Sequence, residues 1–161
     1  MKKSLVAIAL GAALLTACQS VPAKLNPLSP KTQETAVSNK RFISAYDFAT
    51  TVQRIQQGVS DKGMTVFGVI DHAKAAQNAG LNMQPAAVIV FGNPKAGTPL
   101  MVKDPEFALQ LPLKVLVTQT DKGVLVAMTD TKALIAGSKI SYAEVENSLA
   151  KAEMVIESLV K

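Results

Sequence analysis

The amino-acid sequence predicts an α/β or α+β domain of two layers, with helices packed on a mixed sheet of about five strands. First, short apolar, β-branched runs alternate with segments whose apolar residues recur at helical spacing, which suggests crossover connections between strands. Second, Asp121-Lys122-Gly123 separates two apolar runs by a loop short enough for a hairpin, which requires antiparallel neighbours. The two kinds of connection together indicate a mixed sheet.

In the first half of the domain, a helix start is marked by Asp47, a typical N-cap residue. The apolar residues that follow at the spacing of one helical face are Phe48, Val52, Ile55 and Val59. The expected elements are a short strand over residues 42–46, the helix behind the N-cap, a strand over 64–70, a short helix over 72–79 and a buried strand over 86–91.

The second half contains two further helix starts. Thr98 and Pro99 combine a hydroxyl cap with a proline at the first helical position. Ser141 and Glu144 have the spacing of a capping box for a C-terminal helix. The apolar face expected on that helix consists of Val145, Leu149, Ala152, Ile156 and Leu159. The strands expected between these helices span residues 113–120 and 124–128.

The first residues have the layout of a secretory signal, in which Lys2 and Lys3 precede an apolar run over residues 5–15. Leu15-Thr16-Ala17-Cys18 resembles the bacterial lipobox, the peptidase site that ends at a lipid-modified cysteine. The apolar run is shorter than the roughly 20 residues that a transmembrane helix needs. We therefore expect a cleaved lipoprotein signal peptide over residues 1–17. The alternative is an ordinary signal peptide followed by a free thiol.

A lipidated Cys18 would place the domain at a membrane outside the cytoplasm. One acyl chain binds a bilayer only marginally, whereas several, such as diacylglycerol with palmitate, anchor a protein stably. Gln19 stands where an aspartate would, by resemblance to enteric sorting rules, retain a lipoprotein at the inner membrane. The expected location is therefore the periplasmic face of the outer membrane.

The residues after the anchor are expected to form a flexible tether over 18–40, because their polar, proline-containing composition cannot bury enough apolar surface to offset the entropy of ordering. Residues 41–161 suit one globular domain. The formal net charge is +5, and removal of Lys2 and Lys3 with the signal leaves +3. Because the remaining lysines are scattered and do not form a basic patch interleaved with aromatic residues, we expect no nucleic-acid partner.

Several short motifs resemble domain of unknown function family 302 over residues 42–135. They are Ile70-Asp71-His72-Ala73, Gly80-Leu81, Pro85, Phe91-Gly92-Asn93-Pro94, Gly97-Thr98-Pro99-Leu100-Met101, Asp104-Pro105 and Leu111-Pro112-Leu113-Lys114-Val115-Leu116-Val117. The resemblance implies a two-layer α/β domain that is often dimeric and has no established activity. The sequence departs from the family at Thr118, where members usually carry an aromatic residue, and at Met128-Thr129-Asp130-Thr131, where members have a Tyr-Asn-Asp-Pro-like segment.

Two groups of polar residues are candidates for a ligand site. Asp71 and His72 follow a buried strand, and His72 is the only histidine, a residue that can act as a general base or metal ligand. The alternative is that Asp71 caps a helix and His72 lies in its first turn. Asn93, Lys95 and Thr98 lie in a glycine-containing loop before a helix, which could bind an anion or could simply connect a strand to a helix.

Other residues are expected to be structural. Lys114 lies in an apolar strand, which indicates an edge strand or a solvated face more than a pocket. Met83, Met101 and Met128 are expected in the core rather than in a copper site. With one histidine and one cysteine, a transition-metal site is poorly supplied with ligands, so no metal, cofactor or catalytic residue is predicted.

The leading hypothesis is a lipid-anchored, non-catalytic binding or assembly module of the cell envelope. Its expected partners are the bilayer through Cys18, a second copy in a homodimer, and an envelope protein or a small anionic ligand. The alternative is an enzyme or small-molecule sensor whose pocket combines Asp71 and His72 with Asn93, Lys95 and Thr98. That alternative requires the two groups to meet on one concave surface.

Overall fold

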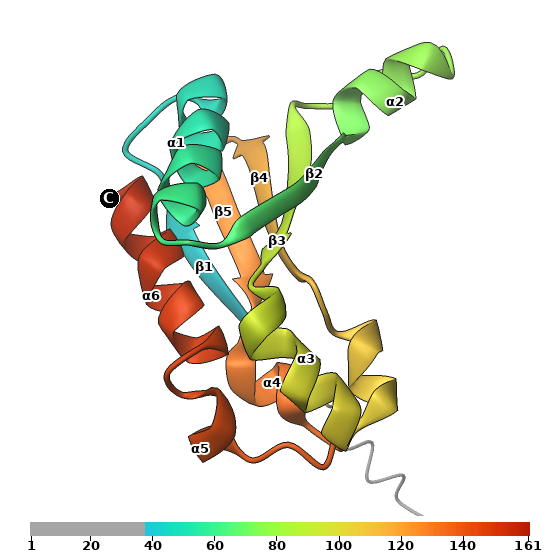
Figure 1. The fold of residues 1–161 in the computed structure, drawn as a ribbon. Helices are drawn as coiled ribbons and strands as arrows, with labels where there is room; N and C mark the ends of the chain where they lie inside the picture. The colour runs from blue at the N-terminus through green and yellow to red at the C-terminus, as the bar shows by residue number, and fades with distance from the viewer. Residues whose placement is uncertain (1–37) are drawn as a thin grey trace, which may run out of the picture. The chain divides into compact units, whose positions relative to one another are not determined.

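The computed structural model describes residues 38–161, so the predictions for the signal peptide, Cys18 and most of the tether lie outside the described residues. Figure 1 shows helices packed on a single sheet. The elements are β1 Asn39–Ile43, α1 Phe48–Asp61, β2 Thr65–Asp71, α2 His72–Asn78, β3 Ala86–Gly92, α3 Pro94–Lys103, the 3-10 helix η1 Pro105–Leu109, β4 Leu113–Thr120, β5 Gly123–Thr129, α4 Thr131–Ile135, α5 Tyr142–Val145 and α6 Leu149–Val160.

The predicted two-layer α+β architecture with five strands is confirmed. The strand order is β1-β5-β4-β3-β2, and every neighbouring pair is antiparallel, where the sequence led us to expect a mixed sheet. The reason lies in α2, which has seven residues and none buried, so it covers no face of the sheet. The segment between β2 and β3 is therefore a long hairpin connection that carries a helix, and it is not a crossover.

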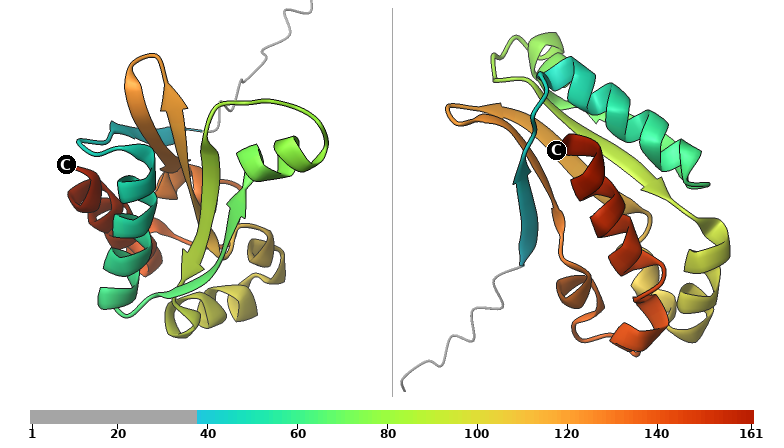
Figure 2. Two further views of the ribbon diagram at one scale, coloured as in Figure 1. Left: turned by 90° about the horizontal axis from the view of Figure 1, so that it is seen from above. Right: turned by 90° about the vertical axis from the view of Figure 1, so that its left-hand side faces the viewer.

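The inner face of the sheet forms the core with α1 and α6. Side chains alternate along the strands, and Ile89, Phe91, Val115, Val117 and Val126 all point inward and are fully buried. Figure 2 shows α1 and α6 side by side over this face. The helices therefore supply the second layer that the sheet needs to exclude water from one of its faces.

The two helices approach each other closely at one glycine. A Cβ atom on Gly58 would lie 2.2 Å from Cδ2 of Leu159, so only a glycine fits there without displacement of that leucine. Arg54 reinforces the contact, because its Nε donates a hydrogen bond of 3.0 Å to the Leu159 carbonyl oxygen. The C-terminal half of α1 is thereby fixed against the last turns of α6.

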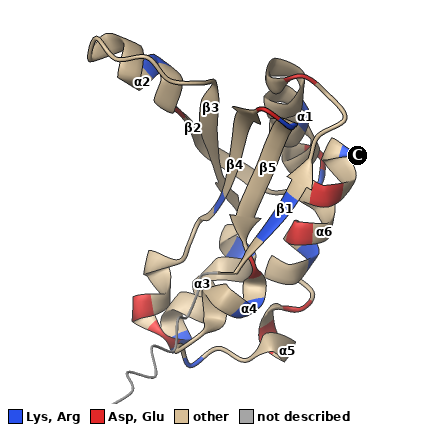
Figure 3. Ribbon diagram, turned by 180° about the vertical axis from the view of Figure 1, so that it is seen from behind, with Lys and Arg blue, Asp and Glu red and all other residues tan. Residues whose placement is uncertain are grey.

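The outer face of the sheet is not covered by a helix of residues 38–161 (Figure 3). Its half-buried apolar side chains are Val88, Val90, Leu116, Leu125 and Ala127. Lys114 lies on this face of the central strand β4 and is exposed, in agreement with a solvated face and not with an edge strand. The register of the edge strand β2 shifts between Val66 and Gly68, which leaves a bulge at Phe67.

The helix starts follow the predicted caps with two corrections. Asp47 accepts a hydrogen bond of 2.8 Å from the Thr50 N–H, and the capping box of Ser141 and Glu144 is present. The helix behind that box is shorter than expected, because α5 ends at Val145 and α6 begins at Leu149. The third helix, α3, begins at Pro94 and not at Pro99, because the Asn93 side chain already caps it by accepting a hydrogen bond from the Lys95 N–H.

Two polar contacts hold the C-terminal helices in place. One carboxylate oxygen of Glu153 in α6 accepts hydrogen bonds from both the N–H and the hydroxyl of Thr131, which begins α4 and is 2% exposed. The Lys103 ammonium at the end of α3 donates hydrogen bonds of 2.7 and 2.8 Å to the two carboxylate oxygens of Glu144 in α5. Segments far apart in the sequence are thus joined at the end of the sheet where α6 begins.

Glu153→Ala should lower the free energy of unfolding by about 1–3 kcal/mol, because it leaves two donors of the buried Thr131 without an acceptor. The measurement is the midpoint of denaturant unfolding. The matched control is Glu157→Ala in the same helix, which removes only an exposed ion pair with Lys161 and should cost about 0–1 kcal/mol. Equal losses in the two variants would contradict the assigned role of Glu153.

Glu144 should make the stability depend on pH in the acid range. The Lys103 ammonium, followed by the backbone and hydroxyl of Ser141, lowers the pKa of Glu144 from 4.5 to about 2. A lowered pKa in the folded state stabilises the protein fully above pH 4.5, and the contribution disappears as the pH falls from 4.5 to 2. Glu144→Gln should therefore flatten the stability profile in this window in thermal unfolding scans. An unchanged profile would contradict this contribution.

Candidate functional site

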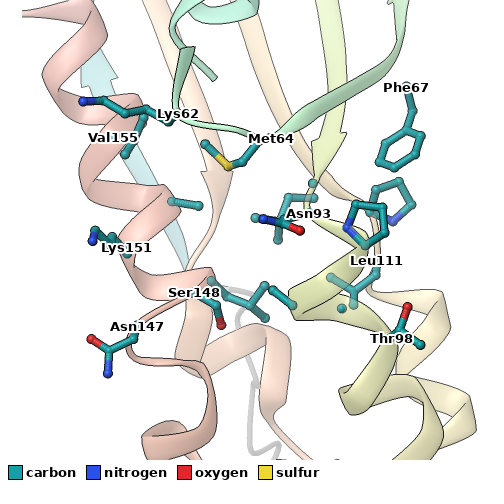
Figure 4. Close-up of a pocket in the computed structure, with 18 of the residues that line it drawn as sticks. Lys62, Met64, Phe67, Asn93, Thr98, Leu111, Asn147, Ser148, Lys151 and Val155 are labelled. Atoms are coloured by element: carbon teal, nitrogen blue, oxygen red, sulfur yellow. The ribbon is translucent and has the colours of Figure 1, made fainter. Parts of the chain in front are cut away.

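A cavity of about 460 Å³ lies between α3 and α6 at one end of the sheet (Figure 4). The antiparallel register brings three strand ends to this place, because Thr65 pairs with Gly92 and Phe91 pairs with Leu113. The start of β2, the end of β3 and the start of β4 therefore form the floor. The volume lies within the range of about 300–1,000 Å³ that is typical of small-molecule sites.

The walls of the cavity are mainly apolar. The apolar residues that line it are Met64, Phe67, Pro94, Ala96, Met101, Leu111, Pro112, Leu113, Leu149, Ala152 and Val155. Phe67 is 55% exposed although it is large and apolar, because the bulge in β2 places it at the side of the cavity and not in the core. A ligand that covers these side chains would bury apolar surface that the domain leaves open to water.

The polar lining consists of neutral amides and hydroxyls together with two lysines. The neutral groups belong to Asn93, Thr98, Asn147 and Ser148, and the lysines are Lys62 and Lys151. Of the described residues that line the cavity, none carries a carboxylate, an imidazole or a thiol. The electrostatic character of the site is therefore positive.

Two of the three residues predicted in the glycine-containing loop line the cavity. Asn93 caps α3 and lines the cavity, and Thr98 lines it from the same helix. The side chain of Lys95 is exposed and does not line the cavity, so this lysine is not placed to hold a ligand there. The structure thus combines Asn93 and Thr98 with side chains from α6 that sequence reasoning did not connect to them.

The other predicted group lies at the opposite end of the same strands. Asp71 pairs with Ala87, whereas Gly92, the residue before Asn93, pairs with Thr65. Six residues of strand separate Asp71 from Thr65, which corresponds to roughly 20 Å. The single pocket required by the alternative hypothesis, with His72 beside the loop of Asn93 to Thr98, is therefore not formed.

Asp71 and His72 lie where the alternative to a ligand site predicts, at the start of a helix. The Asp71 side chain caps α2 by accepting a hydrogen bond of 2.8 Å from the Lys74 N–H, and His72 is exposed in the first turn. Asp71 also lines a second, more open hollow beside α2, and His72 lines neither hollow. Among residues 38–161, no group of three side chains of the kinds that bind metals comes together.

The three methionines expected in the core have different environments. Met128 is in the core with 4% of its surface exposed, whereas Met101 lines the cavity and Met83 is 42% exposed.

Lys62 and Lys151 were not predicted as site residues. Lys62 follows α1 and Lys151 lies on the exposed side of α6, so each resembles an ordinary surface lysine in sequence.

The curated relatives match only part of this chain. Proteins of Brucella suis biovar 1 and Brucella abortus biovar 1, each named fluoride-specific ion channel FluC 1, are 36% identical over 80 residues. These matches cover 50% of this chain and 32% or 30% of the relative, so the similarity spans about a third of the length of those proteins. No helix among residues 38–161 is both long and apolar enough to cross a bilayer.

A solved structure shares the fold. It is described as the crystal structure of an uncharacterized conserved protein DUF302 from Bacillus stearothermophilus, with a TM-score of 0.57, 18% identity, and coverage of 76% of this chain and 91% of the other. The family described as domain of unknown function DUF302 matches residues 41–159. The chain therefore belongs to the DUF302 family.

Proposed function

We propose that this protein is a lipid-anchored, non-catalytic binding module of the cell envelope, and that its ligand occupies the cavity between α3 and α6. The observation that carries the proposal is the lining of the cavity, which is largely apolar with a few amide, hydroxyl and ammonium groups. Apolar walls with few convergent polar groups are typical of sites that bind small molecules.

The chemistry of the lining favours binding over catalysis. General acid–base catalysis most often uses a histidine or a carboxylate within hydrogen-bond reach of the reacting atoms, and less often a lysine. The described residues around the cavity provide two lysines and neutral amides and hydroxyls in place of a histidine or a carboxylate. The amides and hydroxyls can orient a ligand by hydrogen bonds, and the lysines can attract an acidic group on it.

The proposed location of the module at a membrane is inferred from the N-terminal sequence. The lipobox-like segment ending at Cys18 supports acylation and attachment to the periplasmic face of the outer membrane. The similar segment in relatives named as ion channels is compatible with a domain that works beside a membrane. A homodimer and an envelope-protein partner stay predictions, and the uncovered outer face of the sheet offers room for either.

Ligand entry is tested with the neutral apolar dye N-phenyl-1-naphthylamine, whose fluorescence rises in an apolar site. The protein is the full chain carrying Cys18→Ser, so that no attached acyl group competes. Ala96→Phe places a ring at a residue that lines the cavity and should weaken dye binding at least about tenfold, or 1.4 kcal/mol.

The matched control for this experiment is Lys95→Phe, which adds the same ring to the same helix at a residue that does not line the cavity. It should bind the dye as the parent does. Equal binding by both variants, or no binding by the parent, would contradict a ligand site between α3 and α6.

The anchor is tested by fractionation of cells. The parent chain should sediment with membranes, and mass spectrometry should find its mature N-terminus acylated at Cys18. Cys18→Ser removes the only thiol that can carry the lipid, so this variant should leave the membrane fraction. Recovery of the parent in the soluble periplasmic fraction, with an unmodified thiol, would overturn the assignment.

A further inference from the structure

We propose that the cavity binds a single-chain amphiphile with an acidic head group, its hydrocarbon lying between α3 and α6 and its head held between Lys62 and Lys151. This inference rests on the proposed function, because it names the ligand class of the same cavity. It follows from three properties of the lining: where the apolar walls lie, where the lysines lie, and how large the space is.

The apolar walls form a continuous path for a hydrocarbon chain. Met64 lies at the centre of the cavity, and Leu111 and Phe67 lie on the side away from α6 (Figure 4). Phe67 and Met64 come from the start of β2 and the residue before it, and Leu111 precedes β4. A methylene chain that enters beside α6 would therefore meet apolar atoms across the whole width of the cavity.

The two lysines lie on the other side of the cavity, beside α6 (Figure 4). In Figure 4 the ammonium groups of Lys62 and Lys151 are both beside α6 and point outward from the centre, where Asn93 and Met64 lie. Neither lysine forms an ion pair with another residue of 38–161. An acidic head beside α6 would be attracted to these two positive charges, whereas a cationic head would be repelled.

The size and the polarity of the cavity restrict the ligand further. A volume of about 460 Å³ is in the lower part of the range for small-molecule sites, which favours one hydrocarbon chain over two. The hydroxyl of Ser148 and the amide of Asn147 (Figure 4), which precede Lys151 in the chain, can donate hydrogen bonds to the oxygen atoms of a carboxylate or phosphate. These groups would orient the head without fixing which of the two acids it is.

The experiment is calorimetric titration of the full chain carrying Cys18→Ser with octanoate, decanoate and dodecanoate below their micelle concentrations. Affinity should rise about fourfold for each added methylene, because each buried methylene contributes about 0.8 kcal/mol and 1.4 kcal/mol is tenfold. Dodecyl phosphate should bind as dodecanoate does, whereas dodecanol and dodecyltrimethylammonium should bind more weakly. Titration of inorganic phosphate alone should show no binding, since it lacks the chain.

The role of the lysines is tested with Lys62→Gln/Lys151→Gln. This double variant should lose about three- to tenfold in affinity for dodecanoate and should bind dodecanol as the parent does. The control Lys114→Gln/Lys122→Gln removes the same charge at residues that do not line the cavity and should leave both affinities unchanged.

The outcomes separate the inference from the proposed function. If the neutral dye binds but affinity is independent of chain length, or dodecanol binds as tightly as dodecanoate, the amphiphile assignment is wrong and the cavity remains a site for another ligand. Equal effects of the two lysine double variants would also overturn it. If the dye does not bind the parent, the proposed function itself fails.

Discussion

The contact of α1 with α6 at Gly58 and Leu159 determines which part of the sheet the two helices cover and where a cavity is left. At that contact the helices lie too close for a Cβ atom, so they cover the inner face of the sheet as a tight pair. The pair is antiparallel, because Arg54 and Gly58 meet the end of α6 while Lys62 and Lys151 both line the cavity. The end of α1 and the beginning of α6 therefore face the same part of the sheet, where α3 becomes the other wall and a hollow remains.

Most elements of this fold could be predicted from local sequence, because their signals are local. Asp47 and the capping box of Ser141 and Glu144 form the hydrogen bonds that their spacing indicates. The direction of the strands could not be predicted in the same way. A short helix between two strands has the same pattern whether it crosses a sheet face or projects from a hairpin, and α2 projects because it has no apolar face large enough to bury.

The antiparallel direction of the strands also explains why the two predicted groups of site residues do not meet. In a parallel pair the carboxyl ends of both strands meet at one edge, so Asp71 and Asn93 would have been neighbours. In the antiparallel pair of β2 and β3 the same two strand ends lie at opposite edges. The residues that line the cavity together with Asn93, among them Leu149 and Lys151 of α6, lie more than fifty positions later in the sequence. No local pattern in the sequence marks that contact, since it depends on how α6 packs.

The irregular register of β2 affects how molecules of this protein can associate. A free edge strand presents a row of unpaired backbone groups to which a strand from another chain can add, and this is a common route to aggregation. The shift between Val66 and Gly68 interrupts that row on one edge, and Lys40 and Arg41 place charge on the other edge, in β1. The domain can thus expose an apolar sheet face without also offering a template for endless strand addition.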